Sequence, residues 1–201
     1  MRELRLILIV AGLPLGNIIS ALLSEGVPVI SVIIADWLLN MQEDRLPKQP
    51  GSYVIAIELK EEFVGCVGSL GEFCLKPGRY LYFGNARGPG GIRARIKRHL
   101  RVDKKTHWHI DRITLAGQVV EFLVVPDGCE CSLREKAMAL TKLAVPVLGF
   151  GSSDCRLCPA HFLADSDNSR PLLTNLAKTV GGKVYSVPSL LPITAAQPST
   201  V

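Results

Sequence analysis

Five side chains with the chemistry for phosphodiester hydrolysis follow one another along the chain. They are two tyrosines, an arginine, a histidine and a glutamate, namely Tyr53, Tyr82, Arg95, His99 and Glu130. A phenol can relay a proton from water, a guanidinium can stabilise negative charge on phosphate oxygens, and a carboxylate can hold a divalent cation. Arg95 and His99 are four residues apart, so they share one face of a helix. If the fold brings all five together, they form a hydrolytic site.

Each of these residues also has a purely structural interpretation. The tyrosines are side chains that a half-buried strand uses for packing. The glutamate suits the start of a helix, where it interacts favourably with the helix dipole. His99 is equally an exposed member of a basic helix, and Arg93 replaces Arg95 as the phosphate contact if the helix is rotated by half a turn. The ordered series of all five favours the hydrolytic site.

Basic residues are concentrated in one short stretch. The chain has a formal net charge of +5, and eight basic residues fall between residues 87 and 105, where Asp103 is the one acidic residue. Clustered cations favour a polyanionic partner, because neutralised phosphates release their counterions. We therefore expect contacts to nucleic acid, with a solvated basic face as the alternative. The expected contacts are Arg87, Arg93, Lys97, Arg98, Arg101, Lys104, Lys105, His107 and His109.

Two further polar groups are candidates for the hydrolytic cleft. His107, His109 and Asp111 alternate along the sequence, so on a strand they share one face. That face would ligate a metal or contact phosphate, or it is a strand-edge pair of histidines satisfied by its neighbours. Asp154 and Ser152 are the second group expected to line the cleft.

The cysteines indicate a reducing compartment and a metal site. Six cysteines in 201 residues are too few for a disulfide-dense secreted scaffold, so a cytoplasmic location is expected. Cys155, Cys158 and His161 are spaced as three ligands on a tight turn, and Cys131 or Cys129 supplies the fourth ligand of a tetrahedral Zn²⁺. Buried thiols that cap the helix from 130 to 144 are the alternative.

Periodicity predicts an α+β fold with a small antiparallel sheet and helices packed against it. Short apolar runs bounded by Gly, Pro and charged turns indicate strands, whereas apolar residues spaced three or four apart indicate helices. The expected strands are 53–59, 63–67, 79–83, 108–114 and 119–125. The expected helices are 91–101 and a second one that starts near Glu130 and ends before Pro146.

Three parts are expected along the chain, namely an apolar segment over 1–45, a central domain over 46–165 and a C-terminal extension with a flexible tail over 166–201. The first part consists of an apolar run, a stretch whose apolar residues have helical spacing, and a second apolar run, which is typical of a βαβ-like unit. It carries no charge between Arg5 and Glu25, so a membrane anchor within residues 6–35 stays open. The mean hydropathy of +0.27 is high for a soluble chain.

Overall composition excludes several classes. Hydrophobic residues make up 48% of the chain and charged residues 20%, with 18 Gly and 13 Pro. These values exclude wholesale disorder, a collagen-like repeat and a coiled coil. The chain is a folded domain with appendages.

The order of the motifs resembles the GIY-YIG endonuclease superfamily. Gly51-Ser-Tyr53 is similar to its first triplet, and Tyr82-Phe-Gly84 is similar to its second. Arg95-Ile-Lys-Arg-His99 is similar to the helix that follows. A closer resemblance, to a prokaryotic branch of that superfamily, covers about residues 51–163, roughly half of the chain. It rests on Gly88-Pro-Gly-Gly-Ile92, Arg98-His-Leu-Arg101, His107-Trp-His-Ile-Asp111, Glu130-Cys131 and Gly149-Phe-Gly-Ser-Ser-Asp-Cys155.

This resemblance implies a nuclease domain that hydrolyses DNA with one divalent cation, Mg²⁺ or Mn²⁺, in repair, recombination or defence. It implies that Tyr53 or Tyr82 acts as general base or positions the attacking water. Arg95 would contact the scissile phosphate, His99 would assist through a hydrogen bond, and Glu130 would ligate Mg²⁺. The basic residues of the same helix would hold the neighbouring phosphates.

The sequence departs from the family pattern in its connections rather than in these side chains. Ser52 and Phe83 stand where the two triplets have isoleucine. The connection over 54–81 is longer than usual, which implies an added hairpin, and a Gly-Pro-Gly-Gly loop lengthens the approach to Arg95. The hairpin would change the width of the cleft.

Two other function classes fit the same residues. One is a nucleic-acid binding module that keeps the basic helix without turnover. The other is a zinc-stabilised interaction protein whose basic face keeps it in solution.

Overall fold

A six-stranded antiparallel sheet forms the centre of the fold. The computed structural model describes residues 46–67, 70–167 and 171–187, so the expected apolar segment over 1–45 and the end of the tail lie outside the described residues. The strand order is β6-β7-β4-β1-β5-β8, and every neighbouring pair is antiparallel. The strands are β1 (Gly51–Leu59), β4 (Gly78–Asn85), β5 (Gln118–Pro126), β6 (Leu143–Ala144), β7 (Phe162–Asp165) and β8 (Lys183–Ser186).

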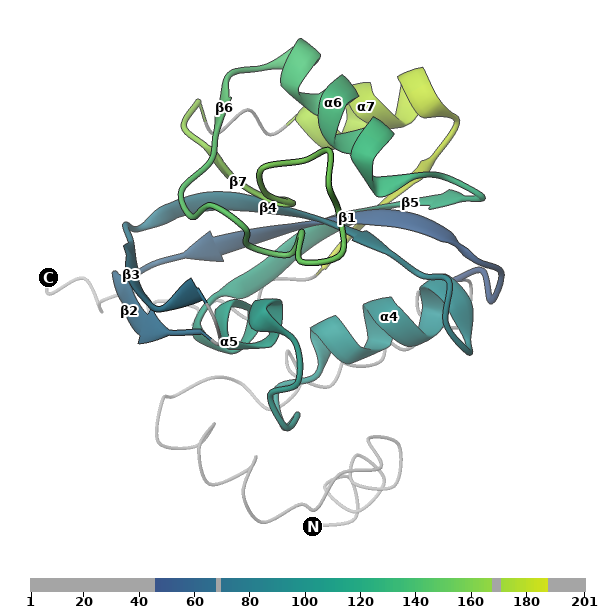
Figure 1. Ribbon diagram of the computed structural model, residues 1–201. Coiled ribbons are helices and arrows are strands. Elements are labelled where there is room, and N and C mark those ends of the chain that lie inside the picture. The colour runs from purple at the N-terminus through teal and green to yellow at the C-terminus, as the bar shows by residue number, and fades with distance from the viewer. Residues whose placement is uncertain (1–45, 68–69, 168–170, 188–201) are drawn as a thin grey trace, which may run out of the picture. The chain divides into compact units, whose positions relative to one another are not determined.

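Helices cover both faces of this sheet. Two of them, α4 (Gly91–Leu100) and α5 (His109–Ala116), lie on one side, and α6 (Glu130–Leu140) and α7 (Leu172–Val180) lie on the other (Figure 1). The expected α+β class is therefore confirmed, as is the helix from Gly91. Within the described residues, no helix is both long enough and apolar enough to cross a bilayer.

The central strand β1 is buried on both faces, which explains its apolar sequence. Tyr53, Ile55 and Ile57 pack with Ile92 and Ile96 on the side of α4. The intervening residues of β1 pack with the apolar stripes of α6 and α7 on the opposite side. A strand covered on both faces has no polar alternation, since each of its side chains enters a core.

The expected strand over 108–114 is wrong, because this stretch forms the helix α5. Ile110 and Ile113 are both buried, and their spacing of three residues puts them on one helical face. The carboxylate of Asp111 accepts the backbone N–H of Trp108 at 2.9 Å, which satisfies a donor at the helix start. The alternation of His107, His109 and Asp111 therefore does not put them on one face of a strand.

The added hairpin implied by the long connection is present. Strands β2 (Phe63–Cys66) and β3 (Glu72–Leu75) pair with each other in a separate two-stranded sheet. Phe73 of β3 packs edge-on against Phe150, with ring centroids 5.9 Å apart. The hairpin therefore supports the loop that contains Phe150.

The compact unit continues past the boundary expected at residue 165. Strand β8 pairs with β5 at one edge of the main sheet, and α7 packs against α6. Both elements belong to the same compact unit as the strands before them. The described part of the expected C-terminal extension therefore completes the sheet.

Candidate functional site

The two candidate tyrosines lie side by side on neighbouring strands. Tyr53 of β1 is paired across the ladder with Gly84 of β4, and its ring centroid lies 6.4 Å from that of Tyr82. The ring of Tyr53 covers the backbone at Gly84 so closely that a Cβ there would overlap it. Gly84 is thus required by the position of the tyrosine on the facing strand.

Tyr53 is joined to His99 inside the domain. The phenol oxygen lies 2.7 Å from His99 Nε2, and both residues are almost fully buried. Burial, together with the nearby Lys104 ammonium, lowers the pKa of His99 to about 3. The imidazole is therefore neutral at neutral pH. Burial also raises the pKa of Tyr53 well above 10, so the phenol stays protonated at neutral pH and donates this hydrogen bond when the imidazole carries its proton on Nδ1.

Arg95 faces the tyrosines, and Trp108 holds its guanidinium. The Arg95 Cζ atom lies 4.4 Å from the centroid of the Trp108 ring, and that of Arg98 lies 4.6 Å away. A guanidinium over an indole is a favourable cation–π arrangement. Arg93, the alternative to Arg95, instead donates from Nε to the carbonyl of Leu46 at 3.0 Å. The structure thus turns Arg95, and not Arg93, toward the tyrosines.

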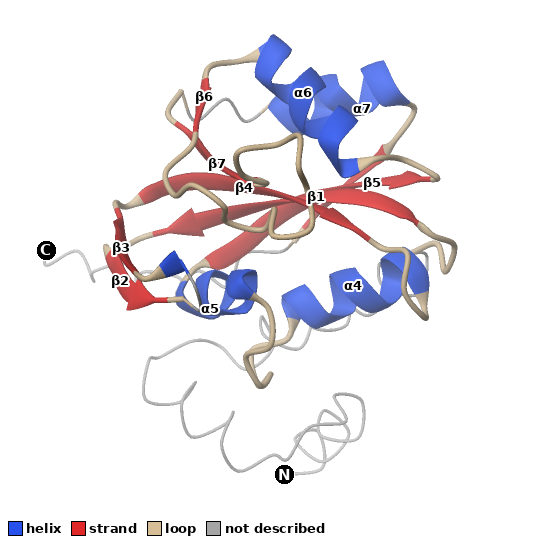
Figure 2. Cartoon of the chain, in the orientation of Figure 1, coloured by secondary structure: helices blue, strands red, loops and turns tan. Residues whose placement is uncertain are grey.

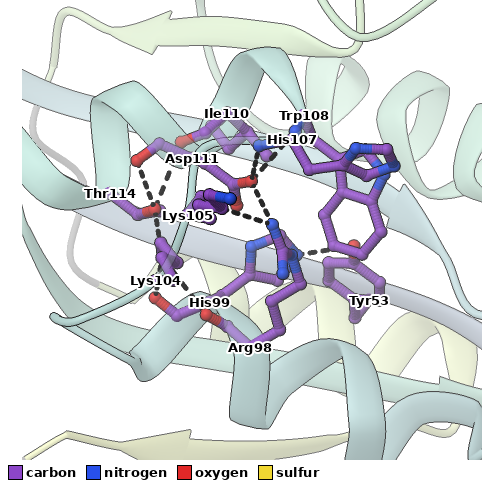
Figure 3. A network of polar contacts seen from close by, with 10 residues as sticks. All are labelled: Tyr53, Arg98, His99, Lys104, Lys105, His107, Trp108, Ile110, Asp111 and Thr114. Carbon is purple, nitrogen blue, oxygen red and sulfur yellow. Dashed lines mark hydrogen bonds and ion pairs between the residues drawn. The ribbon is translucent and has the colours of Figure 1, made fainter.

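Asp111 anchors the Trp108 segment to helix α4 (Figure 3). Its Oδ2 accepts the backbone N–H groups of His107 and Trp108 at 2.8 and 2.9 Å, and Arg98 Nη2 at 2.6 Å. Although burial alone raises a carboxyl pKa, these hydrogen bonds hold the pKa of Asp111 below its usual value. The ring that stacks on Arg95 is therefore fixed by a buried, ionised carboxylate.

The two tyrosines and Arg95 line one pocket of about 440 Å³, whereas His99 lies behind Tyr53 and outside its lining. Tyr53, Tyr82 and Arg95 contribute to its wall, together with Trp108 and Asn85. Burial and the nearby charge of Asp154 raise the pKa of Tyr82 to about 12. The full lining is Tyr53, Tyr82, Phe83, Gly84, Asn85, Arg95, His107, Trp108, His109, Ile110, Gly151, Ser153, Asp154 and His161.

Glu130 lies next to this pocket at the start of α6. Asn85, which lines the pocket, donates from Nδ2 to Glu130 Oε1 at 3.3 Å. The charge of Glu130 contributes to raising the pKa of both Tyr53 and Tyr82. Glu130 Oε2 is buried and has no hydrogen-bond partner within the described residues. An unpaired carboxylate oxygen of this kind suits a cation ligand.

Helix α4 begins with its N–H groups already occupied. The backbone N–H groups of Ile92 and Arg93 donate to the carbonyls of Gln49 and Pro47 at 3.2 and 3.0 Å. Gly91, with a φ of 56°, lies so close to this segment that a side chain there would collide with the Lys48 carbonyl. The N-terminus of the helix therefore binds the preceding chain rather than a phosphate.

Several residues expected to contact nucleic acid take structural positions. Lys104 donates its three N–H bonds to Arg98 O, His99 O and Thr114 Oγ1 at 2.7–3.2 Å. It thereby caps the last turn of α4, and burial lowers its pKa to about 8. Arg98 is held by Asp111 as described above. Among the expected contacts, the side chains exposed to solvent are Arg87, Arg101, Lys105 and His107.

The cysteine and histidine ligands converge on one point. Cys131 Sγ lies 3.6 Å from both Cys155 Sγ and His161 Nε2. The ligand atoms of Cys131, Cys155, Cys158 and His161 all lie within 4.8 Å of one another, so the cluster could hold a metal such as zinc. Tetrahedral Zn²⁺ with bonds of about 2.3 Å separates its sulfur ligands by about 3.8 Å. Cys129 is exposed and lies outside this group, so Cys131 is the candidate for the fourth ligand.

The structure also identifies pocket residues that the sequence did not single out. Trp108 and Asn85 were not among the expected site residues. The available signal was that Trp108 lies inside the motif His107-Trp-His-Ile-Asp111 and that Asn85 directly follows Tyr82-Phe-Gly84. Asp154 lines the pocket as expected, but its companion is Ser153, because Ser152 is buried. His107 and His109 line it from the start of α5 and the turn before it.

Comparison with known proteins assigns the chain to a family without describing an activity. No curated protein and no solved structure matches it. Residues 52–182 match the family described as Domain of unknown function DUF123. This stretch begins beside Tyr53 and includes all residues of the pocket and of the Cys₃His cluster. Since it spans more than half of the 201 residues, the chain belongs to the DUF123 family.

Proposed function

We propose that this domain is an endonuclease that hydrolyses phosphodiester bonds in DNA. The observation that carries the proposal is the convergence of Tyr53, Tyr82 and Arg95 in one pocket, with His99 hydrogen-bonded behind Tyr53. These residues come from two strands and a helix, and the sequence pattern had already grouped them by their chemistry. The resemblance to GIY-YIG endonucleases supports the same reaction.

Tyr53 and His99 provide a path for the proton of the attacking water. With the His99 proton on Nδ1, Tyr53 donates its hydrogen bond to Nε2, so the lone pairs of the phenol oxygen are available to a water in the pocket. As the water attacks phosphorus, its proton passes to Tyr53 and the phenol proton passes to His99. The Arg95 charge helps to keep the pKa of His99 low. A bound phosphodiester offsets that charge and makes His99 a better acceptor.

Arg95 orients the phosphate and stabilises its charge. Its guanidinium rests on Trp108, and it borders the Gly-Pro-Gly-Gly loop at Gly88, where a Cβ would lie 3.0 Å from Arg95 Nη2. A guanidinium fixed in this way needs little rearrangement as charge builds on the non-bridging oxygens. Tyr82 also lines this pocket, and its pKa of about 12 keeps its O–H group protonated, so that it is available as a donor to the phosphate.

The residues around Glu130 fit a divalent cation. Its unpaired Oε2 and the amide oxygen of Asn85 offer the oxygen ligands that Mg²⁺ prefers. When bound, Mg²⁺ supplies positive charge that stabilises the leaving oxygen. Asn85 holds the other oxygen of Glu130 in place, so the carboxylate stays directed without the cation.

We further propose that the Cys₃His cluster binds Zn²⁺ as a structural ion, separate from the Mg²⁺ at Glu130. Thiolates favour zinc over magnesium, which prefers oxygen. Three thiolates and one Zn²⁺ leave a net negative charge, and the buried Arg134 lies one turn after Cys131 on α6. Arg134 also donates from Nε to the carbonyl of Ala160 at 2.8 Å, next to the ligand His161. A buried cation at this place offsets the charge of the loaded site.

The decisive experiment compares cleavage of linear and branched DNA by the parent chain and by Glu130→Ala, with Mg²⁺ or with EDTA. Glu135→Ala is the matched control, since Glu135 is exposed on the same helix. We expect Mg²⁺-dependent cleavage that Glu130→Ala abolishes and Glu135→Ala preserves. Salt-dependent DNA binding with no cleavage in any of the three proteins would indicate a binding module instead. Zinc content without DNA retention at low salt would indicate an interaction protein.

A further inference from the structure

We propose that a metal ion in the Cys₃His cluster builds one wall of the candidate active-site pocket, so that the pocket is complete only in the metal-loaded chain. The structural claim stands on the cluster itself, and its consequence for cleavage rests on the proposed function. The wall is the segment 149–161, the greater part of the connection from β6 to β7, which Figure 2 draws as loop.

His161 belongs to the cluster and to the pocket at once. Its Nε2 lies 3.6 Å from Cys131 Sγ, and its side chain lines the pocket that holds Tyr53 and Arg95. Its backbone carbonyl accepts the N–H of Phe83 on β4 at 2.8 Å. A metal bound by this side chain would therefore be attached directly to a residue of the pocket wall.

The loop that carries the other pocket residues has few bonds of its own. Its ends are anchored at Phe150 and Ala160, which are fully buried, but the tip over 151–158 contains no helix or strand, and the main-chain hydrogen bonds of this tip are short-range, such as Cys155 N to Ser152 O at 3.0 Å. Gly149 N donates to Pro159 O at 2.7 Å and closes the base of the loop. A loop of this kind is held weakly unless a cross-link joins it to the core. Cys155 and Cys158 provide that cross-link through the metal.

The position of this loop decides the shape of the pocket. Ser153 and Asp154, which precede the ligand Cys155, line the pocket. Gly151 approaches Tyr82 so closely that a Cβ at Gly151 would lie 2.6 Å from its ring. Movement of the loop therefore removes the cover of Tyr82 and moves the charge of Asp154 away from it.

The same cluster ties down the start of α6. Cys131 follows the cation ligand Glu130 directly in sequence, and it faces Cys155 from the first turn of the helix. A metal shared by these cysteines joins the wall that carries Asp154 to the element that carries Glu130. Both sides of the proposed cation site are thus fixed relative to each other by one ion.

Trypsin tests the structural claim without any measurement of cleavage activity. Arg156 is exposed between Cys155 and Cys158, so it is a cleavage site within the metal turn. We expect the zinc-loaded chain to resist cutting after Arg156, and the chelated, reduced chain to be cut about 10-fold faster or more. Readdition of Zn²⁺ should restore resistance. Equal cutting rates at Arg156 in the loaded and metal-free forms would overturn the proposal.

Two cysteine variants and an analysis of the tryptic fragments show whether protection at Arg156 depends on the Cys₃His cluster. Cys158→Ser should be cut after Arg156 as fast as the metal-free chain, whereas Cys129→Ser should behave as the parent does, because Cys129 is exposed and outside the cluster. Mass spectrometry of the fragments separates local opening from unfolding. Local opening exposes Arg156 but leaves the buried Arg134 uncut. Simultaneous cutting at both sites in metal-free protein would show global unfolding and would contradict a local role in the wall.

Replacement of zinc by Co²⁺ reports occupancy of the site directly. We expect one Co²⁺ per chain with visible absorption typical of tetrahedral thiolate ligation in the parent and in Cys129→Ser, and loss of that absorption in Cys158→Ser.

DNA cleavage by the loaded and metal-free forms, each with Mg²⁺, then separates the two proposals. If neither form cleaves DNA but the metal still protects Arg156 from trypsin, the proposed nuclease function is refuted, while the proposal that the metal builds the pocket wall stands. If both forms cleave DNA at the same rate, only the proposed dependence of cleavage on the metal in the Cys₃His cluster is refuted.

Discussion

Tyr53 and His99 are 46 residues apart in sequence, yet the phenol oxygen of one lies 2.7 Å from Nε2 of the other inside the domain. Tyr53 is on the central strand and His99 is in the last turn of α4. The bond therefore couples the sheet to the basic helix at the wall of the pocket. The buried phenol and the buried imidazole satisfy each other through this bond, which holds both side chains in fixed positions.

Substitution of Tyr53 by Phe tests its role in proton transfer. The variant keeps the ring over Gly84 but cannot accept a proton from water or pass one to His99. We expect DNA cleavage to slow about 100-fold or more at saturating Mg²⁺, while DNA binding stays within about 2-fold. Tyr82→Phe is the parallel variant. If Tyr53→Phe cleaves at the parent rate and Tyr82→Phe does not, the proton passes through Tyr82.

His99 makes the stability of the domain depend on pH. Its pKa is about 3 in the folded chain, against about 6.5 in the unfolded chain. The unfolded chain therefore binds a proton first as the pH falls below about 6.5, and unfolding becomes easier by up to about 1.4 kcal/mol for each pH unit down to about 3. His99→Gln, which still accepts the Tyr53 hydrogen bond, should flatten this slope. Denaturant titrations between pH 7 and pH 4 provide the measurement, and identical slopes for both proteins would contradict the assignment.

Gly84→Ala should destabilise the domain through a collision with Tyr53. The added methyl group would overlap the phenol ring, so the ring or strand β4 must shift. We expect a loss of about 1–3 kcal/mol in the free energy of unfolding. In a Tyr53→Leu background the colliding end of the ring is gone, and the cost of the alanine should fall by at least about half. A cost that is the same in both backgrounds would show that the collision is not its cause.

Arg79 should be essential for the stability of the sheet, because it joins carboxylates of three other strands. Its buried guanidinium pairs with Glu121 of β5, lies 3.4 Å from Asp165 of β7 and lies 3.9 Å from Glu58 of β1. Arg79→Met leaves these carboxylates without their shared cation, so we expect a loss of about 3–5 kcal/mol. Arg112→Met, at an exposed position on α5, should change stability by about 0.5 kcal/mol or less. Thermal denaturation of the two variants at neutral pH compares them, and similar midpoints would contradict the prediction.

Variants of Lys104 and Arg101 should distinguish a cation that stabilises the fold from a cation that contacts DNA. Lys104→Met removes the cap of α4 and should cost about 1–3 kcal/mol of stability, with no change in the salt dependence of DNA binding. Arg101 is exposed, so Arg101→Ala should leave stability unchanged and reduce the slope of log K against log salt by about 1. The opposite pattern in binding titrations at several salt concentrations would exchange the two assignments.

The sequence predicted the elements whose packing is local and periodic. The strands around Tyr53 and Tyr82 and the helix from Gly91 were predicted because their apolar spacing matches their burial. The strand predicted over 108–114 was wrong. Alternation over so few residues also fits the first turns of a helix, here one whose start is stabilised by Asp111. The place of β8 at the sheet edge is set by pairing with β5, and four residues carry too little pattern to reveal it.

The candidate site was predicted in its residues more than in its contacts. Side-chain chemistry identified Arg95 and the cysteine ligands, but only the fold shows that Trp108 holds the guanidinium. Net charge placed Lys104 among the DNA contacts, whereas its three hydrogen bonds use it as a helix cap. Composition measures the number of cations, and tertiary contacts determine which of them remain available to a ligand.

The outermost strands of the sheet limit how copies of this domain can associate. Strand β6 has two residues and β8 has four, so each edge offers few unpaired backbone groups as a template for a foreign strand. Lys183 places a charge at the start of the β8 edge as well. Concentrated solutions of the domain should therefore resist aggregation by edge-to-edge strand pairing, even though the centre of the sheet is almost wholly apolar.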